Sequence, residues 1–366
     1  MSKRPPIGVA MLGYAFMGRA YSGALLAQRH LEVPFAPELV SICGRNAQAL
    51  EETRRLWGWQ EAVTDWRLQV GDDRVGLFIN GAPNDVHAEP TIAAARAGKH
   101  LICEKPLGRD AQESYEIWQE AERARVKHLC GFNYRFVPAI RLAKELLEAG
   151  ELGEIVHFRA RYLQSWSWDS DPAAWRFDPA RAGTGVLGDI GSHSIDLARY
   201  LVGEIARVSG AVRTIVPRRP VDDHFVAAIE FENGVLGTLE GSQLARGRAN
   251  SNAFEINGTK GSLAFDVERL NELEVADVHG FRRLLVTEAE HPFMRFWWPH
   301  GHIVGWGDTF VHEVAHLLET VAGEHAVAPH GATFEDGYRC SEVTDAILRS
   351  AAGGTRETIT YRGSEA

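Results

Sequence analysis

The amino-acid sequence predicts an α/β protein of two domains, the first built on a parallel sheet and the second on an open, mostly antiparallel sheet. Two observations lead to this prediction. Short apolar runs alternate with helical stretches up to about residue 132, whereas beyond a helical segment at Pro138–Ala149 strand-like segments follow one another and are joined by turns. A chain of 366 residues is also longer than one ordinary core, so we expect domains over residues 1–132 and 133–366.

The first part of the pattern predicts buried strands separated by helices. The expected strands are Ile7–Leu12, Leu39–Cys43, Val75–Asn80, His100–Cys103 and Leu129–Phe132, and the expected helices include Gln48–Trp57, Glu89–Ala97 and Gln112–Arg125. Strands that alternate with helices form right-handed βαβ units, so their carboxyl ends lie along one edge of a parallel sheet. Ligands of such sheets bind at that edge.

The second part predicts a sheet of neighbouring strands with few helices. Its expected strands are Ile155–Gln164, Arg207–Val216, His224–Phe231 and Val235–Gln243, and its expected helices are Ile195–Val202, Thr309–Val321 and Asp336–Ala351. The stretches Glu232-Asn-Gly234 and Asn257-Gly-Thr-Lys-Gly261 carry residues typical of hairpin turns. Hairpins join antiparallel strands, and this is the basis for expecting a mostly antiparallel sheet.

Composition and charge exclude several classes of partner. The chain has 39 Lys and Arg against 49 Asp and Glu, a formal charge of -10, which repels phosphate backbones and argues against nucleic acid as a partner. We see no signal peptide and no apolar run of roughly 18 residues, so we expect no membrane partner. The four cysteines show no clustered spacing, and we expect free thiols and a cytoplasmic location.

The stretch Gly13-Tyr-Ala-Phe-Met-Gly18 follows the first expected strand and opens a helix. It has the GxGxxG spacing with Ala15 at the second glycine. The first glycine permits a tight turn, the last lets the helix pack on the sheet, and the free N–H groups at the helix start hold a pyrophosphate. We therefore predict a Rossmann dinucleotide-binding domain with Gly13, Ala15, Phe16, Met17 and Gly18 at the cofactor, rather than a structural turn alone.

The end of the second expected strand bears on the choice between NAD and NADP. An acidic residue there would bind the ribose 2′-hydroxyl, but the strand ends in Ile42-Cys-Gly-Arg-Asn46. Arg45 has three open roles: it pairs with a 2′-phosphate, stacks on the adenine, or lies in solvent. We place Gly44, Arg45 and Asn46 at the cofactor, an NAD(P), and favour NADP over NAD.

Two further motifs carry candidate catalytic groups. In Cys103-Glu-Lys-Pro106, Lys105 follows a strand of the parallel sheet, where its ammonium can bond a substrate hydroxyl and favour the alkoxide as a hydride leaves. In the glycine-rich block that follows Gly183, Asp189 and His193 are four residues apart and share one face of a helical turn, so His193 is a candidate proton acceptor. The alternatives are a loop lysine and a pair of capping and packing residues.

At this point the chain resembles the Gfo/Idh/MocA oxidoreductases over nearly its whole length. The resemblance rests on the glycine loop, Ala82-Pro-Asn-Asp-Val-His87, Glu104-Lys-Pro106 and Asp189-x-x-x-His193, in that order. It implies a Rossmann domain followed by an α/β domain whose open antiparallel sheet often supports dimers or tetramers. It also implies that Lys105, Asp189 and His193 form the catalytic group.

The resemblance implies further contacts with cofactor and substrate. The implied cofactor contacts are Asn80, Ala82, Pro83, Asn84, His87, Glu104, Lys105, Trp175 and Arg176. The implied substrate contacts are Lys105, Tyr134, Gln164, Trp166, Arg176, Asp189, His193 and His312. We expect an NAD(P)-dependent dehydrogenase that oxidises a secondary ring hydroxyl of a small sugar-like molecule to a ketone, as a homodimer or homotetramer.

Some segments resemble particular branches of the family. Tyr162-Leu-Gln-Ser-Trp166 and Trp175-Arg-Phe177 are most like the levoglucosan dehydrogenases, and Phe265–Leu273 is similar to the L-glucose and scyllo-inositol dehydrogenases. Six of the ten tryptophans lie in the expected second domain, where flat aromatic rings suit the C–H faces of a pyranose. These likenesses imply a ring substrate and leave a free sugar, anhydrosugar, glycoside or cyclitol open.

A rival function comes from an HExxH stretch, His312, Glu313 and His316. On a helix its two histidines share a face and can bind zinc, with Glu313 as general base and His300 or His302 nearby as a third ligand. A zinc hydrolase is therefore a second hypothesis. We favour a core or substrate-facing helix and expect no metal. A third hypothesis is a binding module that keeps its cofactor without turnover.

Overall fold

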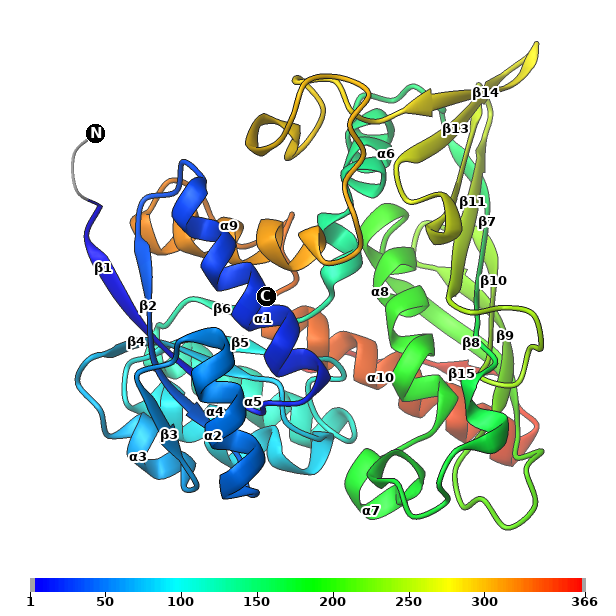
Figure 1. Ribbon diagram of the computed structural model, residues 1–366. Helices are drawn as coiled ribbons and strands as arrows, with labels where there is room; N and C mark the ends of the chain where they lie inside the picture. The colour runs from blue at the N-terminus through cyan, green and yellow to red at the C-terminus, as the bar shows by residue number, and fades with distance from the viewer. Residues whose placement is uncertain (1–3, 364–366) are drawn as a thin grey trace. The chain divides into compact units, whose positions relative to one another are not determined.

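The computed structural model describes residues 4–363, which form two compact units (Figure 1). The first unit comprises the chain up to Gly108 together with Gln112–Phe136 and Trp306–Tyr338, and the second comprises Arg109–Ala111, Val137–Gly305 and the chain from Arg339 onward. The segment Trp306–Tyr338 thus belongs to the first unit although it follows the second-unit sheet in sequence. Domain boundaries at residues 1–132 and 133–366 stay a prediction.

The first unit is built on a six-stranded sheet in the order β3-β2-β1-β4-β5-β6, with every pair parallel. Its strands are β1 (Pro6–Leu12), β2 (Ala36–Cys43), β3 (Glu61–Val63), β4 (Val75–Asn80), β5 (His100–Cys103) and β6 (His128–Cys130). The central strands are nearly continuous apolar runs, as parallel strands buried on both faces require. Val9, Met11, Phe78 and Ile102, for example, are fully buried.

Five helices alternate with the strands of this sheet in the sequence, and a sixth, α9, comes from a later part of the chain. They are α1 (Phe16–Ala27), α2 (Ala47–Trp57), α3 (Trp66–Val70), α4 (Ala88–Arg96), α5 (Ala111–Ala124) and α9 (Asp308–Ala322). Helix α9 packs on α1, where the Tyr21 and Phe310 rings meet edge to face at 5.3 Å and the Gln28 amide donates to the Val311 carbonyl. A distant segment of the sequence thereby completes the unit that holds the glycine loop.

The second unit contains a nine-stranded sheet in the order β14-β13-β12-β11-β7-β10-β9-β8-β15. All its pairs are antiparallel except β7 with β10. Its strands are β7 (Ile155–Leu163), β8 (Ile205–Arg213), β9 (His224–Phe231), β10 (Leu236–Ser242), β11 (Ser251–Gly258), β12 (Ser262–Asp266), β13 (Glu272–Asp277), β14 (Gly280–Leu285) and β15 (Glu357–Thr358).

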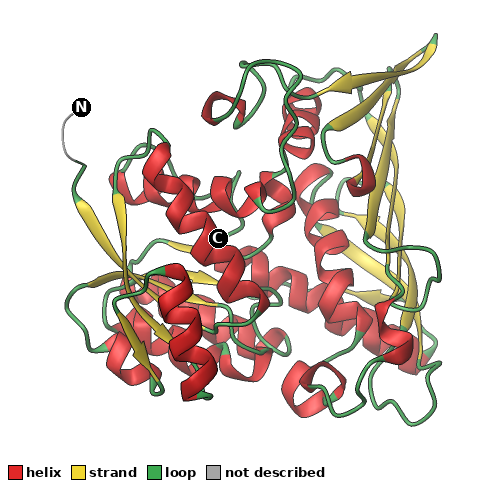
Figure 2. Ribbon diagram, viewed as in Figure 1, coloured by secondary structure: helices red, strands yellow, loops and turns green. Residues whose placement is uncertain are grey.

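Helices of the second unit cover one face of this sheet (Figure 2). They are α6 (Pro138–Glu148), α8 (Ser192–Leu201) and the part of α10 (Phe334–Gly353) that lies in this unit. The short helix α7 (Pro179–Ala182) also belongs to this unit. Inward-facing residues such as Phe158, Phe225 and Phe254 are buried, whereas the alternate residues of the same strands are exposed or half-buried. This period of two is the expected signature of an antiparallel sheet with one open face.

The structure confirms the predicted α/β class and its two sheets, and it moves some element ends for local reasons. Strand β8 ends at Arg213 rather than Val216, because the Asp223 carboxylate accepts the N–H groups of Ile215 and Val216 and draws the chain out of the sheet. All four cysteines are buried free thiols. Within residues 4–363, every helix is too short or too polar to cross a bilayer.

Candidate active site

The glycine loop between β1 and α1 has the geometry that a dinucleotide requires. Gly13 has a φ of 101°, and a β-carbon there would lie 2.7 Å from the Gly81 carbonyl oxygen. A β-carbon on Gly18 would lie 2.4 Å from the Gly13 carbonyl oxygen, so both positions need glycine. Ala15 precedes α1 with a negative φ and gives the helix no side-chain cap, which leaves the first-turn N–H groups for an anion. The loop therefore fits a pyrophosphate.

The residues after β2 are arranged around Tyr14. A β-carbon on Gly44 would lie 2.1 Å from the Tyr14 ring, so glycine lets the ring cover this turn. Arg45 is exposed. Asn46 accepts the N–H of Ala49 at 3.1 Å and caps α2. The cap is a structural role for Asn46 beside its predicted cofactor contact.

Asn80 and His87 organise the loop after β4. The buried Asn80 amide donates to the Val86 and His87 carbonyls and to the Thr91 hydroxyl, while its oxygen accepts the N–H of Ala82. The His87 ring lies 2.9 Å from the Pro106 carbonyl and 3.0 Å from the Ala82 carbonyl. Burial lowers the pKa of His87. Both side chains thus hold loops in place.

Lys105 follows β5 and is half-buried. Its backbone N–H donates to Oε2 of Glu104 at 3.2 Å, and Oε1 of Glu104 accepts the Tyr21 hydroxyl at 3.0 Å. Gly131 makes room for this carboxylate, since a β-carbon there would lie 2.8 Å from Glu104 Oε1. The backbone that presents Lys105 is therefore tied to a buried carboxylate.

The HExxH residues on α9 are engaged with other parts of the first unit. His312 Nδ1 lies 2.8 Å from the Phe136 carbonyl and His316 Nε2 lies 2.9 Å from the Val327 carbonyl. Oε2 of Glu313 lies 3.2 Å from the Tyr21 hydroxyl oxygen. Among residues 4–363, no three His, Cys, Asp or Glu gather as metal ligands would. His312 and Tyr134, which we predict at the substrate, are both buried.

In the second unit, Asp189 lies in a π-helical turn, η6 (Leu187–Gly191), that leads into α8. π-helical turns are frequent at functional sites. The buried Asp222 carboxylate anchors the start of this turn by accepting the N–H groups of Gly185 and Leu187, each at 2.7 Å. The Asp189 carboxylate accepts the Gln243 amide from the end of β10 at 2.7 Å. No sequence motif marks Gln243, because only the fold brings the end of β10 to this turn.

His193 lies in the first turn of α8 and is 6% exposed. Its ring is 5.9 Å from that of Tyr162. The Tyr162 hydroxyl and the Gln164 amide both donate to the Asn250 oxygen at 2.7 Å, and the Trp166 indole donates to Gln164 Oε1 at 2.7 Å. His193, Gln164 and Trp166, which we predict at the substrate, thus lie in the second unit. Asn250 is an additional polar partner of Gln164 there.

The aromatic residues occupy two regions. Arg176 stacks over the Trp175 ring at 4.6 Å, and Trp166 stacks on Phe177 at 5.9 Å, which forms an aromatic cluster in the second unit. Trp306 instead belongs to the first unit and stacks on Phe16 at 5.5 Å. Of the six tryptophans expected in the second domain, Trp306 therefore falls in the first unit.

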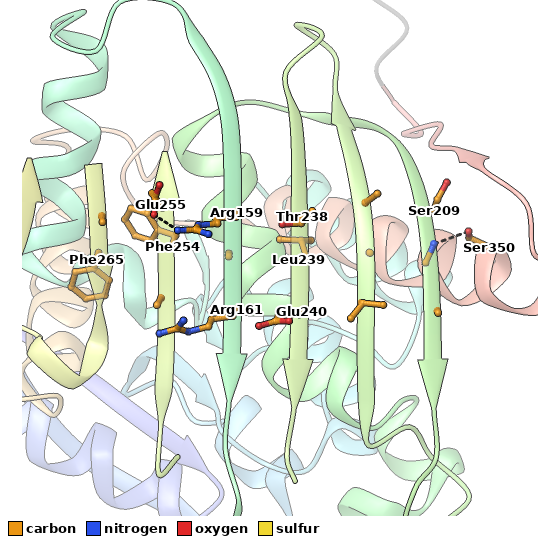
Figure 3. A pocket seen from close by; sticks show the side chains of 18 of the residues that line it. Arg159, Arg161, Ser209, Thr238, Leu239, Glu240, Phe254, Glu255, Phe265 and Ser350 are labelled. Atoms are coloured by element: carbon orange, nitrogen blue, oxygen red, sulfur yellow. Dashed lines mark hydrogen bonds and ion pairs between the residues drawn. The ribbon is translucent and has the colours of Figure 1, made fainter. Parts of the chain in front are cut away.

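A hollow of about 880 Å³ lies elsewhere, on the open face of the second sheet (Figure 3). Arg159, Thr238 and Glu255 come from three neighbouring strands that border it, and Arg159 pairs with Glu255. None of the predicted catalytic residues lines it. We assign this hollow to the sheet surface rather than to catalysis.

Known families and proteins match nearly the whole chain. Residues 7–132 match the oxidoreductase family with the NAD-binding Rossmann fold, and residues 140–264 match the GFO/IDH/MocA C-terminal domain. The levoglucosan dehydrogenase of Pseudarthrobacter phenanthrenivorans is 38% identical, with 94% of this chain and 96% of the relative covered. An inositol 2-dehydrogenase of Rhizobium meliloti is 25% identical, with 86% and 89% covered.

A solved structure of levoglucosan dehydrogenase in complex with NADH and levoglucosan has a TM-score of 0.94 and 37% identity to this chain. It covers 97% of this chain, and all of the solved chain is matched. The chain belongs to the GFO/IDH/MocA family of oxidoreductases, whose N-terminal domain has the NAD-binding Rossmann fold.

Proposed function

We propose that the protein is an NAD(P)-dependent dehydrogenase that oxidises a secondary ring hydroxyl of an anhydrosugar or a related pyranose to a ketone. The observation that carries the proposal is the 38% identity to a levoglucosan dehydrogenase over 94% of the chain. The presence of Lys105, Asp189 and His193 supports a turnover role rather than a silent binding module. A cyclitol is the second candidate, favoured by the likeness to an inositol 2-dehydrogenase.

We propose the following roles for the chain's own residues. The N–H groups after Gly13 hold the pyrophosphate, and the half-buried Lys105 bonds the substrate oxygen and stabilises its developing negative charge. His193 takes the hydroxyl proton, while Asp189, fixed by Gln243, orients the imidazole or a neighbouring hydroxyl. The bound nicotinamide supplies the hydride acceptor.

The test is a substrate panel with each nicotinamide cofactor. Levoglucosan, D-glucose, L-glucose, a methyl glucoside, myo-inositol and scyllo-inositol are each assayed with NAD and NADP by nicotinamide absorbance. Turnover fastest with the anhydrosugar supports the proposal, and turnover fastest with an inositol favours the second candidate. No turnover on the panel, with cofactor bound, would favour the binding module.

The assigned residues are tested with the best substrate. Lys105→Ala and His193→Ala should each lower kcat by at least about 100-fold, because acid–base and electrostatic contributions of single groups reach that size. The matched controls are the exposed Lys127→Ala and His279→Ala, which should change kcat less than about twofold. Near-normal turnover of both site variants would overturn the assignment.

We propose that NADP is preferred over NAD because Arg45 stands, exposed, where an acidic residue would bind the ribose 2′-hydroxyl. Arg45→Ala should then raise KM for NADP at least about tenfold and leave KM for NAD within about threefold, since charge-assisted bonds contribute about 1.5–3 kcal/mol. Equal effects on both cofactors would assign Arg45 to adenine stacking. A wild-type preference for NAD would contradict the proposal.

A further inference from the structure

Tyr21 joins two buried carboxyl groups inside the first unit. Its hydroxyl oxygen lies 3.0 Å from Oε1 of Glu104 and 3.2 Å from Oε2 of Glu313. Tyr21 and Glu313 are fully buried, and Glu104 is 5% exposed. The three side chains come from α1, the end of β5 and α9, so the fold alone assembles them.

The number of protons in this cluster follows from its hydrogen bonds. A tyrosine hydroxyl has one proton and can donate to only one of the two carboxyl groups. Two ionised carboxylates on one phenol oxygen, in a site without water access, would leave the second contact repulsive. A second proton on one of the carboxyl groups turns both contacts into hydrogen bonds.

The contacts identify Glu313 as the carrier of that proton. Glu104 also accepts the Lys105 backbone N–H at 3.2 Å, a bond that favours its ionised form. Oε1 of Glu313 has no hydrogen-bond partner among the described residues, a costly situation for a charged oxygen and a tolerable one for the carbonyl of a neutral acid. Burial, followed by the charge of Glu104, raises the pKa of Glu313 well above its usual range.

We propose that Glu313 is a positioning residue for Lys105, held as a neutral carboxylic acid. The Glu313 O–H donates to the Tyr21 oxygen, the Tyr21 hydroxyl donates to Glu104, and Glu104 holds the Lys105 backbone N–H. This series of hydrogen bonds fixes the backbone that carries the Lys105 side chain. The inference gives the glutamate of the HExxH stretch a role without a metal, and it rests on the proposed function only in assigning Lys105 to the reaction.

The protonation state is tested without any turnover. Infrared spectra of the wild type and Glu313→Gln at pH 7 are subtracted in the carbonyl region of protonated carboxylic acids. A band present in the wild type and lost in Glu313→Gln is expected, whereas the exposed control Glu151→Gln should leave the band in place. A wild type without this band overturns the inference even if the enzyme turns out to act on another substrate.

The positioning role is tested by kinetics with the best substrate of the panel. Glu313→Gln keeps a donor at Tyr21, so kcat should stay within about threefold, while Glu313→Leu and Tyr21→Phe should each lower kcat about tenfold with KM for the cofactor unchanged. The Tyr21→Phe/Glu313→Leu double variant should lose no more than either single variant, because both break one chain. Thermal unfolding identifies variants that fail to fold.

Two kinetic outcomes would overturn the positioning role. If Glu313→Gln loses as much kcat as Glu313→Leu, the neutral donor is not what Tyr21 requires. If Tyr21→Phe, correctly folded, keeps wild-type kcat, the hydrogen-bond chain does not position Lys105. An inactive wild type with the infrared band present would instead count against the proposed function alone.

Discussion

At the scale of single residues, the Asp189 carboxylate depends on a partner that lies 54 positions away in sequence. Gln243 is 3% exposed and donates to Asp189 Oδ2 at 2.7 Å. A half-buried carboxylate with a fixed oxygen has fewer orientations than one in solvent. This bond therefore belongs to the preorganisation of the proposed catalytic group.

We predict that Gln243→Ala lowers kcat about tenfold, because loss of one hydrogen bond to a charged group costs about 1.5–3 kcal/mol, of which part appears in the transition state. KM for the cofactor should not change. Steady-state kinetics measures both, with the exposed Gln112→Ala as the matched control. An unchanged kcat in Gln243→Ala would show that Asp189 needs no such support.

The sequence predicts those site residues whose chemistry is local. The glycine loop, Lys105 and the Asp189–His193 pair each stand in a short motif. The residues of such a motif are close in sequence, so their spacing can be recognised without the structure. Tyr21, Gln243 and Asn250 have no such signal: each acquires its role from a partner on a distant element. Packing, which the local pattern does not encode, decides those contacts.

At the scale of elements, the first backbone N–H of helix α5 is hydrogen-bonded to a side chain of helix α10. The Asp345 carboxylate accepts the N–H of Ala111, the first residue of α5, at 3.0 Å. Burial, with the nearby charges of Asp110 and Glu342, raises the pKa of Asp345 to about 6. A carboxyl group whose pKa is higher in the folded than in the unfolded chain binds more protons when folded, so it lowers stability as pH rises.

We predict that Asp345→Asn stabilises the protein at pH 7 and not at pH 4. The wild type loses stability between pH about 4 and about 6, the window between the unfolded and folded pKa of Asp345, by at most about 3 kcal/mol. Asparagine keeps the oxygen that accepts the Ala111 N–H and removes the charge. Denaturant unfolding at both pH values measures the difference. A gain of equal size at pH 4 and pH 7 would contradict this account.

The hydrophobic pattern of the sequence predicts the bounds of some strands and not of others. The mainly apolar run Val75–Asn80 coincides with β4. A strand of a parallel sheet is buried on both faces, so it is visible in the sequence as a nearly continuous apolar run. Strand β6 ends at Cys130, two residues before the apolar run does, since the Phe132 N–H turns back to the Cys130 carbonyl. Such turns are set by backbone bonds that hydropathy does not show.

At the scale of the whole molecule, the open face of the second sheet bears on assembly. Strands β8, β9, β11 and β12 present the small side chains Ala211, Ala228, Ala253 and Ala264 on this face. The Arg159–Glu255 pair joins β7 and β11 on the same face (Figure 3). Val226 is 42% exposed in this surface. Small residues and paired charges let two sheets approach face to face, at a spacing of about 10 Å. We propose that a second copy of the chain covers this face, in a homodimer or homotetramer.

We predict that Val226→Arg dissociates this assembly. Val226 lies between Ala211 on β8 and Glu240 on β10, so an arginine there places a large charged group in the middle of the proposed interface. Sedimentation velocity should give a dimer or tetramer for the wild type and a monomer for the variant. Val278→Arg is the matched control, because Val278 is 91% exposed between β13 and β14 and away from the small-residue surface. A monomeric wild type, or a Val226→Arg variant that sediments like the wild type, would show that this face is not the subunit interface. The face would then be exposed to solvent, as one face of an antiparallel sheet can be.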